Sequence, residues 1–265
     1  MSLRSITLFL LAGTLPGPAA SAAGYGLSYI RQAPEPAVSS SASGAVPTVH
    51  SSMPVYPLRH PIRAFLELNR NSEKVFQQKL ALPYIALGMV ALANDQKAEK
   101  WFKVAGPGEP TPKFAKTFNH FGDGKVLLPA MGALYLVGRS NERDTAKLWA
   151  VAVLNSAVFS QSLKMLTGKE RPNQSPDAIV YHGPSTKFDS WPSGHMTAAT
   201  ASAVVLGHQY PNAKYAFYAL AACVGLARIE GGNHWPSDVY WGAGVGYYSA
   251  WQVIHHKDDV LRWRF

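Results

Sequence analysis

The stretch Ser190-Trp-Pro-Ser-Gly-His195 stands directly before an apolar helical segment and determines how that segment begins. Ser193 is a preferred N-cap residue, so Gly194 and His195 fall in the first turn of the predicted helix. Free backbone N–H groups and the helix dipole attract an anion to such a turn. Glycine lets a ligand approach the backbone closely. The stretch therefore predicts an anion site with the His195 imidazole at its rim.

Apolar segments with helical character lie on both sides of this stretch. The sequence predicts helices over 80–93, 126–137, 146–166, 196–210, 215–228 and 237–255. Thr167-Gly168 is typical of a helix C-terminus and ends the longest of them. A 14-residue helix spans only about 21 Å, against about 30 Å for a bilayer core. Since β-strand signals are weak, we expect an all-α fold, a compact bundle of about six core helices that is soluble or lies on a membrane.

The N-terminal region has a different composition. Residues 1–22 combine Arg4, a short apolar core and Ala20-Ser-Ala22, which is the pattern of a cleaved signal peptide. Residues 23–61 are rich in Pro, Ser and Ala and predict a flexible arm, and residues 62–265 are expected to form the helical domain. We therefore expect a periplasmic or secreted protein. The alternative is an uncleaved anchor that keeps the chain on the membrane, facing the periplasm.

The charge balance indicates the kind of partner. The net charge is +9 and the isoelectric point about 9.6, which favours anionic partners such as phosphoesters or acidic lipid headgroups. No nucleic-acid-binding module is visible, so nucleic acid ranks last. The lone cysteine, Cys223, forms no internal disulfide, and its apolar helical surroundings predict a buried side chain. The oligomeric state does not follow from composition.

Two further segments carry charged residues at predicted helix ends. Lys164 falls on the last turn of the helix before Gly168, and Arg171 follows on the loop, so both can reach one ligand. Downstream, His234 lies four residues before Asp238, whose carboxylate can orient the imidazole. Each residue alone also fits a plain structural role, as a helix cap or a solvated cation. The three spacings together favour a single phosphate site.

Lys164-x6-Arg171-Pro172, Pro192-Ser-Gly-His195 and Arg228-x5-His234-x3-Asp238 resemble the three-part signature of the PAP2 (type 2 phosphatidic acid phosphatase) superfamily. That superfamily includes lipid phosphatases, bacterial acid phosphatases and vanadium haloperoxidases. The resemblance implies a PAP2-type helical fold and a phosphatase that needs no metal or cofactor. One departure stands out, because the serine that usually precedes the arginine of the third segment is Ala227 here.

The resemblance also implies a role for each matched residue. His234 is expected to be the nucleophile that forms a phosphohistidine, with Asp238 as its orienting partner. His195 is expected to protonate the leaving alcohol. The phosphate-binding residues are then Lys164, Arg171, Ser193, Gly194 and Arg228.

The substrate class stays open between two kinds of phosphoester. Basic charge and an aromatic, arginine-rich C-terminus favour a phosphorylated lipid and peripheral contact with an anionic membrane. A soluble broad-specificity acid phosphatase is the alternative, followed by a vanadate-dependent haloperoxidase. Ala227 also makes a non-catalytic phosphate-binding protein conceivable. Other residues are less specific: His120 is a candidate for the pocket border, and Trp191 and Trp235 fit either a pocket wall or the core.

Overall fold

The computed structural model describes residues 66–69, 78–102 and 110–263. The signal peptide expected at 1–22 and the arm expected at 23–61 lie outside these ranges. The helices are α5 (Gln78–Ala93), α6 (Asp95–Trp101), α7 (Lys113–Phe118), η1 (Asn119–Gly122), α8 (Gly124–Val137), α9 (Ser140–Thr167), α10 (Gly194–Gln209), η2 (Pro211–Ala213), α11 (Lys214–Glu230), α12 (Pro236–His255) and α13 (Lys257–Arg262). No strand occurs in the described ranges, so the all-α prediction is confirmed.

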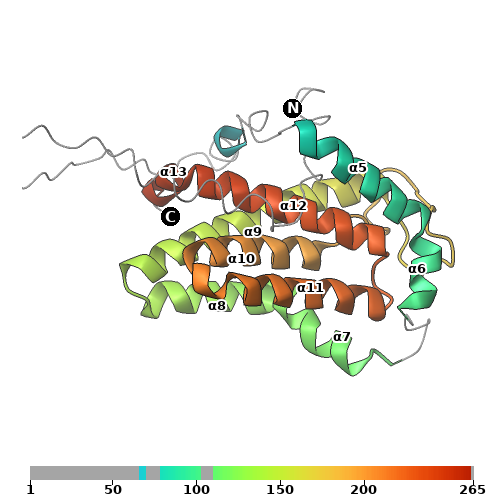
Figure 1. Ribbon diagram of the computed structural model, residues 1–265, viewed down its shortest axis with the longest axis horizontal. Coiled ribbons are helices and arrows are strands. Elements are labelled where there is room, and N and C mark those ends of the chain that lie inside the picture. The colour runs from blue at the N-terminus through green and yellow to red at the C-terminus, as the bar shows by residue number, and fades with distance from the viewer. Residues whose placement is uncertain (1–65, 70–77, 103–109, 264–265) are drawn as a thin grey trace, which may run out of the picture.

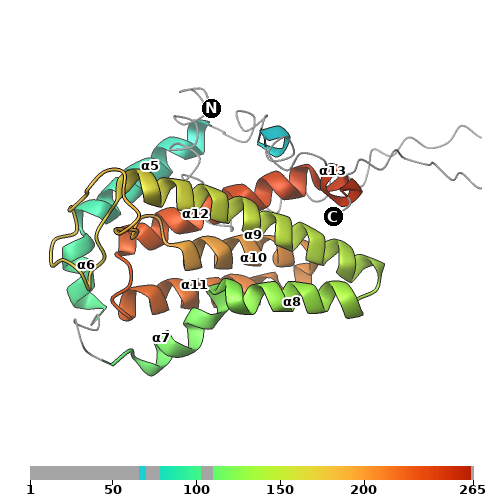
Figure 2. The ribbon, with the colours of Figure 1, turned by 180° about the vertical axis from the view of Figure 1, so that it is seen from behind.

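The long helices α8 to α12 run roughly side by side, and α5, α6 and α7 gather toward one end of this bundle (Figure 1). Helix α10 is central, because α9, α11 and α12 all pack against it. Seen from behind, α9 and α8 form the near side of the bundle (Figure 2). The described helices outnumber the six core helices expected, since short helices such as α6, α7 and α13 extend the bundle at its ends.

Small residues allow α10 to be enclosed on several sides. Its buried positions include Ala199, Ala201 and Ala203, which let neighbouring helices approach closely. On α12, a Cβ at Gly242 would lie 2.7 Å from the Ser193 carbonyl oxygen, and a Cβ at Gly246 would meet Thr197 in the same way. These two close approaches fix the start of α10 against α12.

Local signals place the helix ends close to where the sequence predicts them. Helix α9 ends at Thr167, and Gly168 adopts the left-handed conformation with φ 56°. Helix α9 begins earlier than expected, at Ser140, since the polar residues before Ala146 continue the same helix. The lone cysteine, Cys223, is only partly buried, which corrects the expectation of a buried side chain.

No helix in the described ranges combines the length and the hydropathy needed to cross a lipid bilayer.

Candidate active site

Four helix ends meet at the end of the bundle that lies on the right in Figure 1. They are the C-termini of α9 and α11 and the N-termini of α10 and α12. Each of the three predicted sequence segments begins or ends at one of these termini. The arrangement brings groups that are far apart in the chain to one place.

Lys164 lies in the last turn of α9 with only 6% of its surface exposed. Its Nζ donates to the backbone carbonyl of Asp189 and lies 3.9 Å from the Asp189 carboxylate. Burial lowers the pKa of Lys164 to about 8; Asp189 opposes this, and the cations Arg171 and Arg228 add to it. The ammonium is thus held among like charges, which an added anion would relieve.

Arg171 is held on the loop after α9 by a two-point ion pair with Asp189. Its Nε donates to Oδ1 at 3.0 Å and its Nη2 donates to Oδ2 at 2.9 Å. Burial raises the pKa of the Asp189 carboxyl, but the hydrogen bonds from Arg171 and the charge of Lys164 outweigh it and keep that pKa below its ordinary value. The loop therefore carries one carboxylate that both cations share, and the sequence pattern did not single it out.

The N-terminus of α10 has the predicted cap. The Ser193 hydroxyl accepts from the Met196 backbone N–H at 3.4 Å. A Cβ at Gly194 would lie 3.7 Å from Cε of Lys164, so the Lys164 side chain runs alongside the first turn of α10. Both predicted phosphate-binding elements, the helix start and the lysine, are therefore adjacent.

His195 is partly buried just behind this helix start. Burial lowers its pKa to about 4, and the charges of Arg228, Arg171 and Lys164 act in the same direction against Asp123. The charges of all three predicted cations therefore act on the His195 imidazole.

Arg228 closes the site from the last turn of α11. It is 7% exposed, and its Nη1 donates to the Asn119 side-chain oxygen at 3.1 Å, while its Nε is buried without a hydrogen-bond partner among the described residues. Burial lowers its pKa to about 10, and Arg171 adds to this against Asp123 and Asp189. A buried guanidinium with an unpaired donor is well prepared to bind an oxyanion.

His234 is buried between α11 and α12, with 2% of its surface exposed. Its Nδ1 lies 3.7 Å from Oδ2 of Asp238, which is close for a charge interaction but longer than a hydrogen bond. Burial lowers the pKa of His234, Asp238 opposes this, and Arg228, Lys164 and Arg171 lower it further. The imidazole is thus neutral at neutral pH, with its Nε2 on the side away from Asp238.

The structure also shows partners of the predicted Asp238 that the sequence did not reveal. Asp238 is fully buried and accepts hydrogen bonds from the Trp235 backbone N–H at 3.0 Å, from the Ser190 hydroxyl at 2.5 Å and from Lys169 Nζ at 2.8 Å. Asp95 of α6 is joined to the same lysine at 3.1 Å. Lys169 lies inside the first motif, but its spacing alone gave no reason to select it.

The less specific candidates differ in their surroundings. His120 is exposed on η1, next to Asn119, whose side chain accepts from Arg228, so it stays a candidate for the border of the site. Trp235 is fully buried and its Nε1 donates to the Glu170 carbonyl at 2.9 Å, which is a core role. Trp191 is partly buried and meets Trp241 edge to face.

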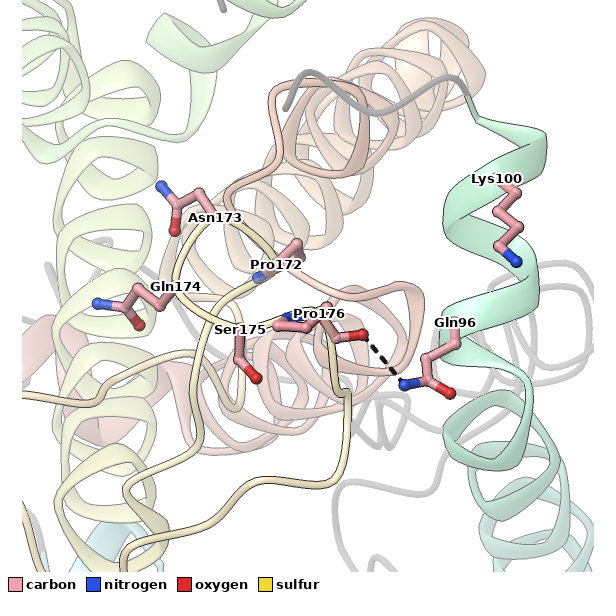
Figure 3. A pocket seen from close by; sticks show the side chains of 7 residues that line it. All are labelled: Gln96, Lys100, Pro172, Asn173, Gln174, Ser175 and Pro176. Atoms are coloured by element: carbon pink, nitrogen blue, oxygen red, sulfur yellow. Dashed lines mark hydrogen bonds between the residues drawn. The ribbon is translucent and has the colours of Figure 1, made fainter. Parts of the chain in front are cut away.

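A separate pocket lies between α6 and the turn that follows Arg171 (Figure 3). Gln96 and Lys100 line one side and residues 172–176 the other, and Gln96 Nε2 donates to the Pro176 carbonyl at 3.1 Å. Neither imidazole lines it, so this pocket is distinct from the cluster around His234.

The cluster as a whole is suited to a tetrahedral oxyanion. Three cations and a helix N-terminus supply positive charge, and one neutral imidazole can attack while the other transfers a proton.

The chain is similar to known phosphatases. A family model described as PAP2 superfamily matches residues 146–261. The chain is 28% identical over 161 residues to a lipid A 1-phosphatase of Rhizobium johnstonii, covering 54% of this chain and 65% of that protein. It is 32% identical over 135 residues to a decaprenylphosphoryl-5-phosphoribose phosphatase of Mycobacterium tuberculosis, covering 50% of this chain and 72% of that protein.

The solved structure of LpxE from Aquifex aeolicus is also similar, with 28% identity, a TM-score of 0.44, and coverage of 54% of this chain and 84% of that chain. The chain spans less than two thirds of the two Rhizobium lipid A 1-phosphatases that it matches, 65% of one and 42% of the other.

Proposed function

Because the chain belongs to the PAP2 superfamily, we propose that it is a phosphatase that hydrolyses phosphomonoesters or lipid diphosphates through a covalent phosphohistidine. The observation that carries the proposal is the neutral, buried His234 beside Asp238, in the electrostatic field of three cations that also surround His195. Those cations supply the charge that phosphoryl transfer requires, so the proposal includes no metal or cofactor.

In the first step, Nε2 of His234 attacks phosphorus, and the bond from phosphorus to the leaving oxygen breaks. His195 donates its proton to that oxygen, so the alcohol leaves neutral. The free-protein pKa of about 4 at His195 rises when the negative substrate enters, because the dianion offsets the neighbouring cations. His195 is therefore protonated more readily when substrate is bound than in the free protein.

In the second step, His195 takes a proton from water as that water attacks the phosphorus. The bond between phosphorus and Nε2 breaks, and inorganic phosphate and neutral His234 are released. Asp238 stabilises the positive charge that His234 carries in the intermediate, which is the part an orienting carboxylate plays beside a catalytic imidazole. Lys164, Arg171, Arg228 and the first turn of α10 hold the phosphoryl oxygens throughout.

The test is phosphate release by the full chain from a panel of lipid and soluble phosphoesters. His234→Ala is expected to lose activity to background, and His195→Ala to lose about 10²–10⁴-fold. His182→Ala is the matched control, because His182 is exposed and paired with Glu170 outside the cluster. Wild-type activity retained in His234→Ala would rule out the covalent mechanism, and bromide oxidation with vanadate but no phosphate release would favour a haloperoxidase.

A phosphorylated lipid is the substrate class that we favour. The similar proteins named above are lipid A 1-phosphatase and decaprenylphosphoryl-5-phosphoribose phosphatase. The described helices also expose large apolar side chains to solvent, with Leu136 at 74% and Val137 at 84% on α8. More of them lie on α5 and α9: Leu82, Leu87, Met89, Val90, Leu154, Val158, Met165 and Leu166. Such faces are suited to contact with a lipid surface.

The proposal therefore includes peripheral binding to an anionic membrane, through these apolar faces and the basic net charge. Flotation with vesicles that contain acidic phospholipid is expected to recover the wild-type chain. Leu136→Glu together with Val137→Glu is expected to reduce recovery, and Lys187→Glu is a control at an exposed site away from α8. Equal activity on soluble and lipid phosphoesters without vesicle binding would instead favour the broad-specificity acid phosphatase.

Export through a signal peptide at 1–22 completes the proposal, with 23–61 as an arm before the helical domain. N-terminal sequencing of the chain from the periplasmic or secreted fraction is expected to begin at Ala23. A chain that retains Met1 and stays in the membrane fraction would support the anchored alternative.

A further inference from the structure

A buried ion cluster includes Asp238, the carboxylate beside His234. Lys169 Nζ donates to Oδ1 of Asp238 at 2.8 Å and to Oδ2 of Asp95 at 3.1 Å. All three side chains are 0% exposed. Burying such charges is costly unless each is paired, so this cluster is held together by its own ion pairs.

The chain fixes Lys169 on several sides. It follows the left-handed Gly168, and its carbonyl accepts from the Ser190 backbone N–H at 3.0 Å. Its Nζ lies 5.8 Å from the centre of the Tyr181 ring and 5.9 Å from that of the Trp235 ring. The lysine side chain therefore has one direction available, toward the two carboxylates.

Asp95 brings helix α6 into the same cluster. Its Oδ1 accepts from the Ser237 backbone N–H at 2.8 Å, and its Oδ2 accepts from the Ser237 hydroxyl at 2.6 Å. Burial raises the pKa of Asp95; Lys169 and Ser237 lower it, and Asp238 adds to the rise. Asp95 therefore holds Lys169 in place, and its carboxylate binds a proton at higher pH than the carboxylate of Asp238 does.

The two oxygens of Asp238 are used differently. Oδ1 is taken by Lys169, while Oδ2 accepts from Ser190 and Trp235 and faces Nδ1 of His234 at 3.7 Å. Burial raises the pKa of Asp238, but Lys169 and His234 outweigh it and the pKa lies below its ordinary value. Lys169 is thus the strongest influence that keeps this carboxylate ionised.

We propose that Lys169 is a positioning residue: it holds the Asp238 carboxylate in place, ionised and turned toward His234, with Asp95 as its anchor. The proposal rests on the phosphohistidine mechanism above. The charged and titratable groups that face Asp238 are Lys169, Asp95, His234, Tyr181 and Lys164. Among them Lys169 is the cation in direct contact with the carboxylate.

Removal of the Lys169 cation is expected to raise the pKa of Asp238. Without Lys169, two buried carboxylates lie together with no cation between them. Asp95 takes up the first proton because its pKa is the higher of the two, but Asp238 has lost the strongest influence that lowers its own pKa, so it too binds a proton at higher pH than in the wild type. A protonated Asp238 no longer stabilises positive charge on His234. Activity is then lost at a higher pH on the acid side of the profile, which a merely structural role for Lys169 would not produce.

The test measures kcat and KM against pH for the full-length Lys169→Met variant, using a substrate on which the wild type is active. The pH at which kcat falls on the acid side of its profile, the acid limb, is expected to be higher by about 1–3 pH units than in the wild type. KM on the alkaline side is expected to stay within about twofold, because Lys169 does not line the phosphate site. Lys169→Arg is expected to restore the limb in large part, since it keeps the charge.

Lys187→Met is the matched control, because it removes one cation from an exposed position of the same segment between α9 and α10. Its profile is expected to match that of the wild type. An unmoved acid limb in a folded Lys169→Met variant would overturn the proposal. Wild-type inactivity would instead overturn the proposed function.

Asp95→Asn provides a second test that does not depend on the folding of Lys169→Met. This change removes a negative charge near Asp238 but keeps the ion pair between Asp238 and Lys169. The acid limb is therefore expected to stay at the same pH or to move to a lower pH. The amide oxygen can still accept from Ser237, which favours folding. An acid limb that moves up in Asp95→Asn would contradict the assigned arrangement of charges.

Discussion

Anion binding is expected to draw a proton onto Lys164 near pH 8. Burial and the neighbouring cations lower the pKa of this lysine to about 8 in the free protein. A dianion between Lys164, Arg171 and Arg228 reverses that repulsion and raises the pKa toward its ordinary value. At about pH 8, half of the free molecules lack this proton, so binding takes up about half a proton per site. Above that pH, affinity falls by up to about tenfold per pH unit.

The assay is titration calorimetry with molybdate, a tetrahedral oxyanion that remains a dianion in this range, in buffers of different ionisation enthalpy. The slope of the observed enthalpy against the buffer's ionisation enthalpy gives the number of protons taken up. Arg228 contributes little near pH 8, because its pKa is about 10. His195 also contributes little, because a bound dianion that raises its pKa from about 4 toward the ordinary value of 6.5 still leaves it mostly neutral at pH 8. Lys164→Arg keeps the charge at all these pH values, so its uptake is expected to vanish. Equal uptake in both proteins, or none in the wild type, would refute the reasoning.

Two further predictions concern packing and charge. Gly246→Ala is expected to destabilise the fold by about 1–3 kcal/mol, because its Cβ would lie 2.9 Å from Cβ of Thr200 on α10. Gly132→Ala, with nothing within 4 Å, is expected to be neutral or slightly stabilising, and equal losses of melting temperature would contradict this contrast. Asp189→Asn removes the carboxylate that competes for Arg171 and is expected to tighten molybdate binding about threefold or more, the effect of one charge at roughly 6 Å in water. Weaker binding in a dissociation-constant measurement would show that Asp189 chiefly orients the arginine.

Local signals made much of the site predictable. Ser193 as an N-cap and Gly168 as a helix terminus act over a few residues, and both appear where the sequence places them. The spacing of Lys164 to Arg171 and of His234 to Asp238 likewise fits helix ends that face one cluster. These features depend on neighbouring residues, so a pattern in the chain is enough to find them.

Long-range pairings were not predictable in the same way. Asp95 contacts Ser237 across 142 residues, and Asn119 contacts Arg228 across 109. No period or spacing links such residues, because helix packing alone brings them together. For the same reason the sequence assigned Asp238 to His234 but missed Lys169, whose link to Asp238 is shorter.

The position of Asp95 and Asn119 bears on how short a working version of this protein can be. The region matched by the family model, 146–261, begins after both residues. A truncated chain cut to that region would keep both imidazoles but leave a lysine and an arginine each without one of its polar partners. The smallest piece worth expressing therefore starts upstream of α6, well before the boundary that sequence similarity suggests.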